Sequence, residues 1–144
     1  MMKLRALPGI FLLLLACSAV AHSQSLVEEF SFQIKDFKMD HQTQSNNLNI
    51  SISYRYITNI QKPQYPDFRW LAKDVETLLA NYPNKDDYWE IVNKQITSLL
   101  LNKYSAITSV TCELKVDPSS LIPYTRSSRV TRERGPNKSN RKRV

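Results

Sequence analysis

Hydrophobic and polar residues alternate in two runs near the start of the chain. From Phe30 to Met39 apolar residues occupy every second position, and their phase shifts by one at residues 35–36. This alternation predicts a strand with one buried face, and the shift predicts a β-bulge. Residues 48–56 alternate without interruption and predict a second strand. Since the polar segment between the runs ends in Ser45-Asn46-Asn47, we expect an antiparallel hairpin with its turn there.

Two segments in the middle of the chain have helical spacing. Asp67 follows a proline-containing break and is placed to cap a helix whose apolar residues recur every three or four positions as far as Tyr82. A second helix is predicted to begin at Asp86 or Asp87. Its predicted buried side comprises Trp89, Val92, Ile96, Leu99 and Leu100.

Alternation returns after the second helix. Residues 109–116 predict a third strand, and residues 124–131 predict a weakly patterned fourth. The resulting ββααββ order excludes the ferredoxin-like βαββαβ order and doubly wound folds. We therefore expect one α+β domain over residues 30–131, a four-stranded antiparallel sheet with two consecutive helices on one face. Such a sheet leaves edges and a face uncovered, so we also expect an oligomer.

The first 21 residues have the pattern of a secretory signal peptide. Lys3 and Arg5 precede an apolar run that is too short to span a bilayer, and small residues follow it. Ala19-Val20-Ala21 fits cleavage by ordinary signal peptidase, whereas a lipobox that would anchor the protein through Cys17 is the alternative. We expect export to the periplasm or the medium, a polar leader over residues 22–29, and no transmembrane segment in the mature protein.

The positive charge of the chain is concentrated at its C-terminal end. Lys and Arg number 20 against 13 Asp and Glu, a formal net charge of +7. From Arg126 onward there are eight basic residues and one acid, whereas residues 22–125 carry ten basic and twelve acidic residues, a net −2. Residues 132–144 therefore predict a basic disordered tail, which serves solubility, contacts an anionic surface or recruits a partner. Specific nucleic-acid binding is not indicated, because Tyr54, Tyr56 and Tyr65 near Arg55 do not form an alternation of aromatic and basic residues of the kind that stacks bases.

Metal and cofactor chemistry are not indicated either. The two histidines, His22 and His41, are far apart in polar segments, and Cys112 is the single cysteine of the predicted domain. Cys112 lies in the inward phase of its strand, which predicts a small buried hydrophobe. The two glycines of the chain are too few for a glycine-rich phosphate loop.

Several motifs lie at informative places in the ββααββ order. They are the opening of the first helix, Asp67-Phe68, the opening of the second, Trp89-Glu90, and the run LLLNKYSAITSVTCELKVDP. Together they resemble the tunnelling fold and, within it, the dihydroneopterin aldolase family, over about residues 30–131. The resemblance implies sheets assembled into a barrel. It also implies a pterin- or purine-like ring bound at a subunit interface and held by an acidic or amide side chain.

By this resemblance Glu90 is the ligand anchor, with Trp89 beside it and with Phe68 and Asp67 as further ligand-contacting residues. A carboxylate pairs well with adjacent N–H groups of a heterocycle. A second interpretation stays open, because Glu90 stands three residues after Asp87 and would complete a capping box at the helix N-terminus.

The family's catalytic residues are largely replaced in this sequence. Asp117 stands where the family has a lysine, Phe68 replaces a tyrosine, and the acidic residue of the first hairpin loop falls near His41. Retro-aldol chemistry needs groups that move protons. The sequence therefore predicts an exported protein that binds a pterin- or purine-like molecule, as an aldolase-like enzyme or an inactive relative. The alternative is an exported structural or protein-interaction module without a small-molecule site.

Overall fold

The predicted strands form one antiparallel sheet in the computed structural model, which describes residues 26–135. The strands are β1 (Glu29–His41), β2 (Gln44–Tyr56), β3 (Ile107–Val116) and β4 (Arg126–Glu133), and they lie in the order β1-β2-β3-β4. Each strand pairs antiparallel with its neighbour. The predicted signal peptide with Cys17, and the tail beyond residue 135, lie outside the described residues.

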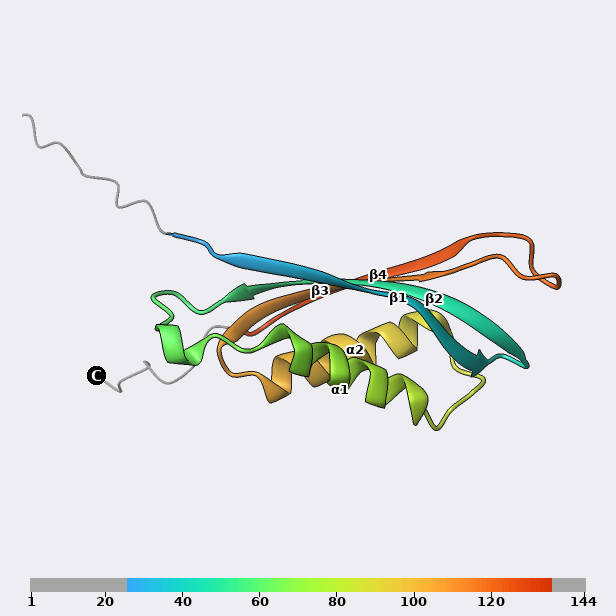
Figure 1. Cartoon of the computed structure of the whole chain (residues 1–144), viewed down its shortest axis with the longest axis horizontal. Helices are drawn as coiled ribbons and strands as arrows, with labels where there is room; N and C mark the ends of the chain where they lie inside the picture. The colour runs from blue at the N-terminus through green and yellow to red at the C-terminus, as the bar shows by residue number, and fades with distance from the viewer. Residues whose placement is uncertain (1–25, 136–144) are drawn as a thin grey trace, which may run out of the picture.

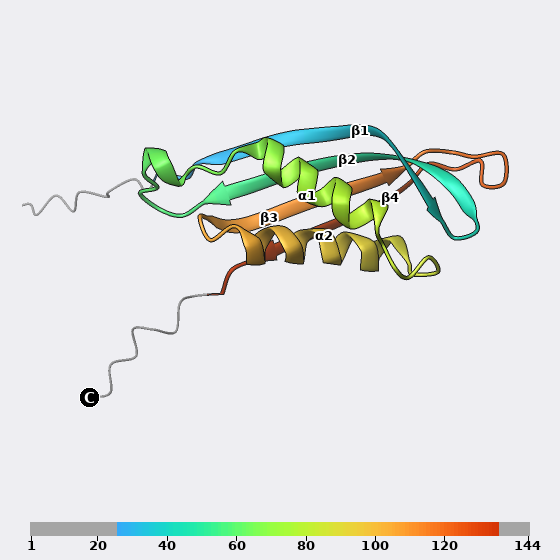
Figure 2. The ribbon, with the colours of Figure 1, turned by 60° about the horizontal axis from the view of Figure 1, so that its bottom comes forward.

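Two helices cover one face of this sheet (Figure 1). They are α1 (Phe68–Ala80) and α2 (Trp89–Lys103), and the short 3-10 helix η1 (Lys62–Gln64) precedes α1. Figure 2 shows the two helices running in opposite directions across the sheet, with α1 packed on β1 and α2 on β3 and β4. The predicted α+β class, with both helices on one face, is confirmed. Within residues 26–135 no helix is both long and apolar enough to cross a membrane.

The hydrophobic core follows from the alternation in the sequence. The inward side chains of β2 from Leu48 to Tyr54 are at most 1% exposed, and Leu71 and Val75 of α1 are fully buried against the sheet. Removal of this apolar surface from water is the main driving force for the layered arrangement. Cys112 belongs to the same core, as predicted.

The predicted bulge in β1 is confirmed. The register between β1 and β2 shifts between Ile34 and Phe37, and Asp36 has a left-handed φ of 55°. The extra residue returns the apolar phase of β1 to the inner face, because Phe37 lies opposite the buried Leu48.

The β1–β2 turn lies earlier than residues 45–47, where the sequence predicted it. Gln42 and Thr43 form the turn, with φ values of 51° and 63°, and β2 already begins at Gln44. Asn46 is 3% exposed, and its Nδ2 donates to the carbonyls of residues 39, 41 and 44. Asn46, which looks like a turn former in the sequence, is therefore a buried residue whose hydrogen bonds hold the two strands of the hairpin together.

The start of α2 also differs from the prediction. Tyr88 is the N-cap residue, so the helix begins two or three residues later than the predicted Asp86 or Asp87. Asp87 is engaged in the preceding loop, where its carboxylate accepts a hydrogen bond from Tyr82 Oη at 2.8 Å. Its carbonyl lies 2.8 Å from His41 Nε2. These contacts fix the loop and leave Asp87 outside the helix.

At the C-terminal side, β4 takes in the first two residues of the segment predicted to be a tail. Arg132 pairs with Val110 and Glu133 with Ser109 in the register of β3 and β4. The next residue, Arg134, donates from Nε to the carbonyl of Ile107 at 3.2 Å. The ordered domain thus reaches past residue 131, because backbone pairing with β3 continues there.

Candidate functional site

A cavity of about 300 Å³ lies where α2 begins. Four elements that are distant in the sequence meet there: the β1–β2 turn, the first turn of α2, the end of β3 and the start of β4. We call this space the α2 cavity. It is lined by Gln42, Tyr88, Trp89, Glu90, Val116, Arg126, Ser127 and Ser128. Its volume is at the lower end of the range typical for small-molecule sites.

Glu90 lies at the rim of the α2 cavity, in the first turn of the helix. Within residues 26–135 its exposed side chain has neither a hydrogen bond nor an ion pair. The capping box with Asp87 does not form, since the N-cap is Tyr88 and no side chain bonds there. The open backbone N–H groups of the helix start still favour a negative charge at this position. Among the described residues the carboxylate thus has no competing partner and is available for a ligand.

Trp89 forms a rigid wall of the cavity. It is 7% exposed, and its ring centroid lies 4.5 Å from that of the buried His41. His41 is held in turn by the carbonyl of Asp87 and by an edge contact with Tyr82, at 5.9 Å between centroids. Burial, and then the hydrogen bond to Asp87, raise the pKa of Tyr82 to about 12. Tyr82 therefore remains a neutral donor at any physiological pH.

A cation faces the same cavity from β4. Arg126 is partly buried, and its Nη2 lies 3.5 Å from Oδ1 of Asn46. Because the amide nitrogen of Asn46 is occupied by three hairpin carbonyls, its oxygen is directed at Arg126. No ion pair of Arg126 is present among the described residues.

The floor of the cavity is tied to α2 by Asn93. This residue is fully buried, and its Nδ2 donates to the carbonyls of Cys112 and Ser128 at 3.1 and 2.9 Å. It also lies 3.2 Å from the hydroxyl of Ser128, which lines the cavity. The positions of β3 and β4 are in this way coupled to the first turns of the helix.

Two of the four predicted ligand residues are not at this cavity. Phe68 and Asp67 stand at the start of α1, at the opposite end of the sheet from the start of α2 (Figures 1 and 2). Asp67 caps α1 by accepting a hydrogen bond from the backbone N–H of Arg69 at 3.0 Å. Hydrogen bonds from the Arg69 side chain, and then from this N–H, lower the pKa of Asp67 to about 2. Within one chain the structure thus brings together Glu90 and Trp89 but not Phe68 and Asp67.

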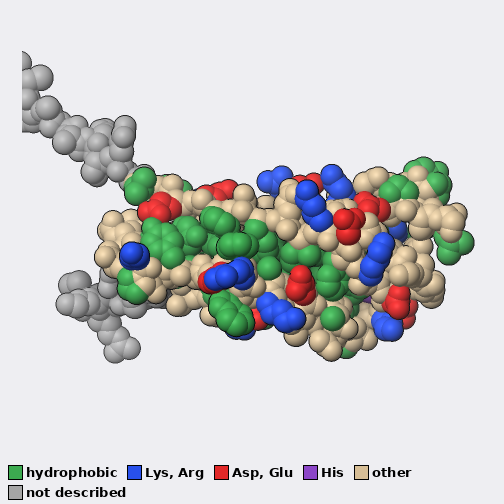
Figure 3. Space-filling model, viewed as in Figure 1, with side chains coloured by type: hydrophobic (Ala, Val, Ile, Leu, Met, Phe, Trp, Pro, Cys, Tyr) green, Lys and Arg blue, Asp and Glu red, His purple; other side chains and the backbone are tan. Residues whose placement is uncertain are grey.

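Phe68 instead belongs to an exposed cluster of rings between β1 and α1. It lies 5.5 Å from Phe30 and 5.9 Å from Phe32, centroid to centroid. Figure 3 shows hydrophobic surface along this side of the molecule. Phe30 and Phe68 are about 40% exposed, which is unusual for neighbouring large rings. We call this cluster the aromatic patch; its members are Phe30, Phe32, Tyr56, Tyr65 and Phe68.

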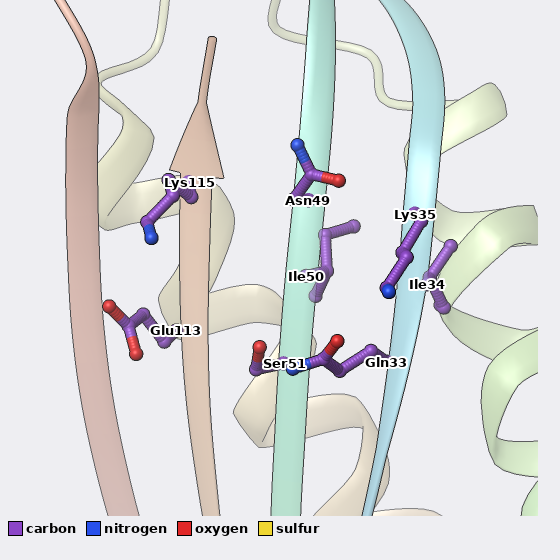
Figure 4. A pocket seen from close by; sticks show the side chains of 8 residues that line it. All are labelled: Gln33, Ile34, Lys35, Asn49, Ile50, Ser51, Glu113 and Lys115. Atoms are coloured by element: carbon purple, nitrogen blue, oxygen red, sulfur yellow. The ribbon is translucent and has the colours of Figure 1, made fainter.

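The sheet face opposite the helices carries a second hollow, of about 290 Å³ (Figure 4). The side chains that reach into it from β1, β2 and β3 are polar, among them Lys35, Ser51 and Glu113. The two isoleucines that border it belong to the core on the other side of the sheet. This groove offers no apolar wall to a planar ring, so the α2 cavity is the better candidate.

Asp117, which the sequence resemblance predicts to replace a lysine of the family, does not line the α2 cavity. Its carboxylate accepts hydrogen bonds from the side chains of Asn47 and Asn49 on β2. Asp117 is therefore held by the sheet and has a structural role.

The described part of the chain holds one cysteine, Cys112, in its core. Cys112 is fully buried, and burial raises the pKa of its thiol to about 12, so the thiol stays protonated. Within residues 26–135 no three His, Cys, Asp or Glu side chains gather as a metal site would require.

Three residues of the site could not be recognised in the sequence. Arg126 was counted with the basic end of the chain, Asn46 resembled a turn former, and Asn93 looked like an ordinary polar helix residue. A weak signal for Asn93 existed, because it is spaced like the buried residues Trp89 and Ile96 on the same side of α2. For Arg126 and Asn46 only the strand register brings the two side chains together.

Comparison with solved structures supports the fold. A Vibrio cholerae protein assigned as a dihydroneopterin aldolase aligns with 73% of this chain and 98% of its own, with a TM-score of 0.56 and 9% identity. A dihydroneopterin aldolase from Burkholderia thailendensis, solved with bound guanine, aligns with 74% of this chain and 92% of its own, with a TM-score of 0.55 and 12% identity. No protein-family model and no curated protein match the sequence.

Proposed function

We propose that this protein binds a planar pterin- or purine-like molecule in the α2 cavity, with Glu90 as the anchor. The observation that carries the proposal is an unpaired carboxylate at the rim of a 300 Å³ cavity whose wall is the buried ring of Trp89. A carboxylate accepts two N–H groups side by side, which matches the ring and exocyclic N–H groups of such a heterocycle. The guanine bound to the Burkholderia protein of the same fold is a ligand of this type.

A second copy of the chain would complete the site. Phe68 lies at the far end of the protomer, in the exposed aromatic patch, and β1 and β4 each have only one neighbour among the described strands. Edge pairing between β1 of one copy and β4 of another would cover both edges. It would also place β1, which carries Phe30 and Phe32, beside the partner's β4, whose first residues line the α2 cavity. In a closed assembly of this kind the polar outer face of the sheet would line the interior.

The proposal concerns binding. Retro-aldol chemistry needs a group that moves protons at the ligand, and no lysine lines the α2 cavity. Asp117 is engaged by two asparagines of β2. A reaction at this site would have to use Glu90, Tyr88 or a residue from the second copy.

The test is calorimetric or thermal-shift titration with neopterin, biopterin, guanine and urate. We expect at least one of them to bind wild type and to raise its melting temperature. Glu90→Gln keeps the shape of the side chain but replaces one acceptor oxygen by a donor. It should weaken binding at least about tenfold, since a hydrogen bond to a charged group contributes about 1.5–3 kcal/mol.

Asp86→Asn is the matched control, because it removes an acidic charge from the exposed loop just before α2 without touching the cavity. It should leave the affinity unchanged. Binding that is equally strong in wild type and Glu90→Gln would reject the anchor role. The absence of binding for all four compounds would favour the alternative, an interaction module that uses the aromatic patch without a small-molecule site.

A further inference from the structure

The α2 cavity combines two opposite charges that do not neutralise each other. Glu90 of α2 and Arg126 of β4 both line it. The ion pairs present among residues 26–135 join other partners, so these two groups are more than 4 Å apart. A ligand that touches both must offer donors on one side and acceptors on the other.

Two residues that line the cavity carry hydrogen-bond donors without a partner within residues 26–135. The Nε atom of Arg126 and the Nε1 atom of Trp89 are buried, and neither has a hydrogen-bond partner in the described part of the chain. Buried polar atoms without partners are rare in native proteins, because each costs free energy unless it is satisfied. Arg126 and Trp89, which both line the cavity, thus carry donors that a ligand with acceptor atoms would satisfy.

The side chain of Arg126 is held in place by a buried neighbour. Its Nη2 lies 3.5 Å from Oδ1 of Asn46, a residue that is 3% exposed and clamped by three hairpin carbonyls. A guanidinium restrained in this way has lost part of its rotamer freedom before a ligand arrives, which favours tight, directional pairing with an anionic oxygen group.

We propose that Arg126 selects heterocycles that carry a negatively charged oxygen group, a carboxylate or a phosphate, opposite the N–H edge bound by Glu90. This proposal rests on the proposed function of the α2 cavity and names its ligand class. It distinguishes the protein from the guanine-bound Burkholderia neighbour, whose ligand is uncharged at neutral pH.

The test compares the affinities of two pairs of ligands. Pterin and pterin-6-carboxylate differ in a carboxylate alone, whereas guanine and guanosine 5′-monophosphate differ in a phosphate and the ribose that links it to the base. For wild type at pH 7 and low salt, we expect at least one anionic member to bind ten times or more tighter than its neutral partner. Because the cation that pairs with the anionic group is lost, Arg126→Gln should reduce this preference to less than about threefold. Arg126→Lys should retain part of it, because it keeps the charge but loses the planar fork.

Arg129→Gln is the matched control, since Arg129 lies on the same strand but on the opposite face, paired across from Glu113. It should keep the full preference. The two ligand pairs separate a carboxylate on the ring from a phosphate on a linker. Melting temperatures without ligand establish that each variant is folded.

Equal affinity for both members of both pairs, or an equal loss for both members in Arg126→Gln, would overturn the selectivity role of Arg126. If Glu90→Gln still weakened the neutral ligand in that case, the proposed binding function would stand. If none of the four compounds bound to wild type, both proposals would fail together.

Discussion

At the scale of single residues, buried amides determine the geometry of the α2 cavity. Asn46 clamps the β1–β2 hairpin and faces Arg126, and Asn93 ties α2 to β3 and β4 through three contacts of one nitrogen. A buried amide is favourable only when its partners are placed to bond it. Through their side-chain nitrogens these two residues therefore favour one arrangement of the cavity walls.

Asn93→Ala is predicted to lower the free energy of unfolding by about 1–3 kcal/mol, because the buried carbonyls of Cys112 and Ser128 lose a donor. Urea denaturation followed by circular dichroism measures the change. Asn102→Ala is the control, since Asn102 is exposed in the last turn of the same helix, and its effect should stay within about 0.5 kcal/mol. Equal effects of the two substitutions would contradict a special role for Asn93.

At the scale of elements, the β1–β2 turn carries local strain. A two-residue turn with both φ values positive is common in hairpins but suits Asn and Gly, whereas this chain has Gln42 and the β-branched Thr43. The clamp by Asn46 and the bonds from the turn to the loop before α2 hold this conformation. The turn is thus kept by tertiary contacts rather than by its own residue preferences.

Thr43→Gly is predicted to raise the free energy of unfolding by about 1 kcal/mol, because glycine adopts a φ of 63° without steric cost. Ser45→Gly, two residues away in the regular part of β2, should lower it by about 0.5–1 kcal/mol. Thermal or urea unfolding of the two variants checks the opposite signs. A loss of stability in Thr43→Gly would show that the side chain contributes more than the strain that it causes.

At the scale of the whole molecule, the protomer has two open edges and an exposed aromatic patch between β1 and α1. One helical layer covers only one face of the sheet. Phe30 and Phe68 are both exposed in this patch. Assembly through this side would bury the rings and pair the edge strands, which is why the proposed site is shared between copies.

Size-exclusion chromatography with light scattering should therefore give a mass of several chains at micromolar concentration. Phe30→Lys places a charge in the patch on an edge strand and should shift the mass toward one chain while the far-ultraviolet circular dichroism spectrum is retained. Leu121→Lys is the control, because Leu121 is 75% exposed against 40% for Phe30 and lies in the β3–β4 loop, at the other end of the sheet from Phe30. If wild type had the mass of a single chain, the proposal that two copies share the site would be rejected.

The sequence by itself determined the ββααββ order, the inward residues of β2 and β3, the bulge in β1 and the cap of α1 by Asp67. These features depend on periodicity and on neighbours within a few residues, and such information is local. It also placed Glu90 and Trp89 together, because they are adjacent in the first turn of one helix.

Only the tertiary structure decided which residues from distant parts of the sequence lie beside Glu90 and Trp89. Asn46 and Arg126 are 80 positions apart, and β-strand register brings them to one cavity. The fold also places Phe68 and Glu90 at opposite ends of the sheet. It brings Asp117 within hydrogen-bond distance of Asn47 and Asn49. Long-range pairing is set by the summed packing of the whole sheet, so no short motif contains it.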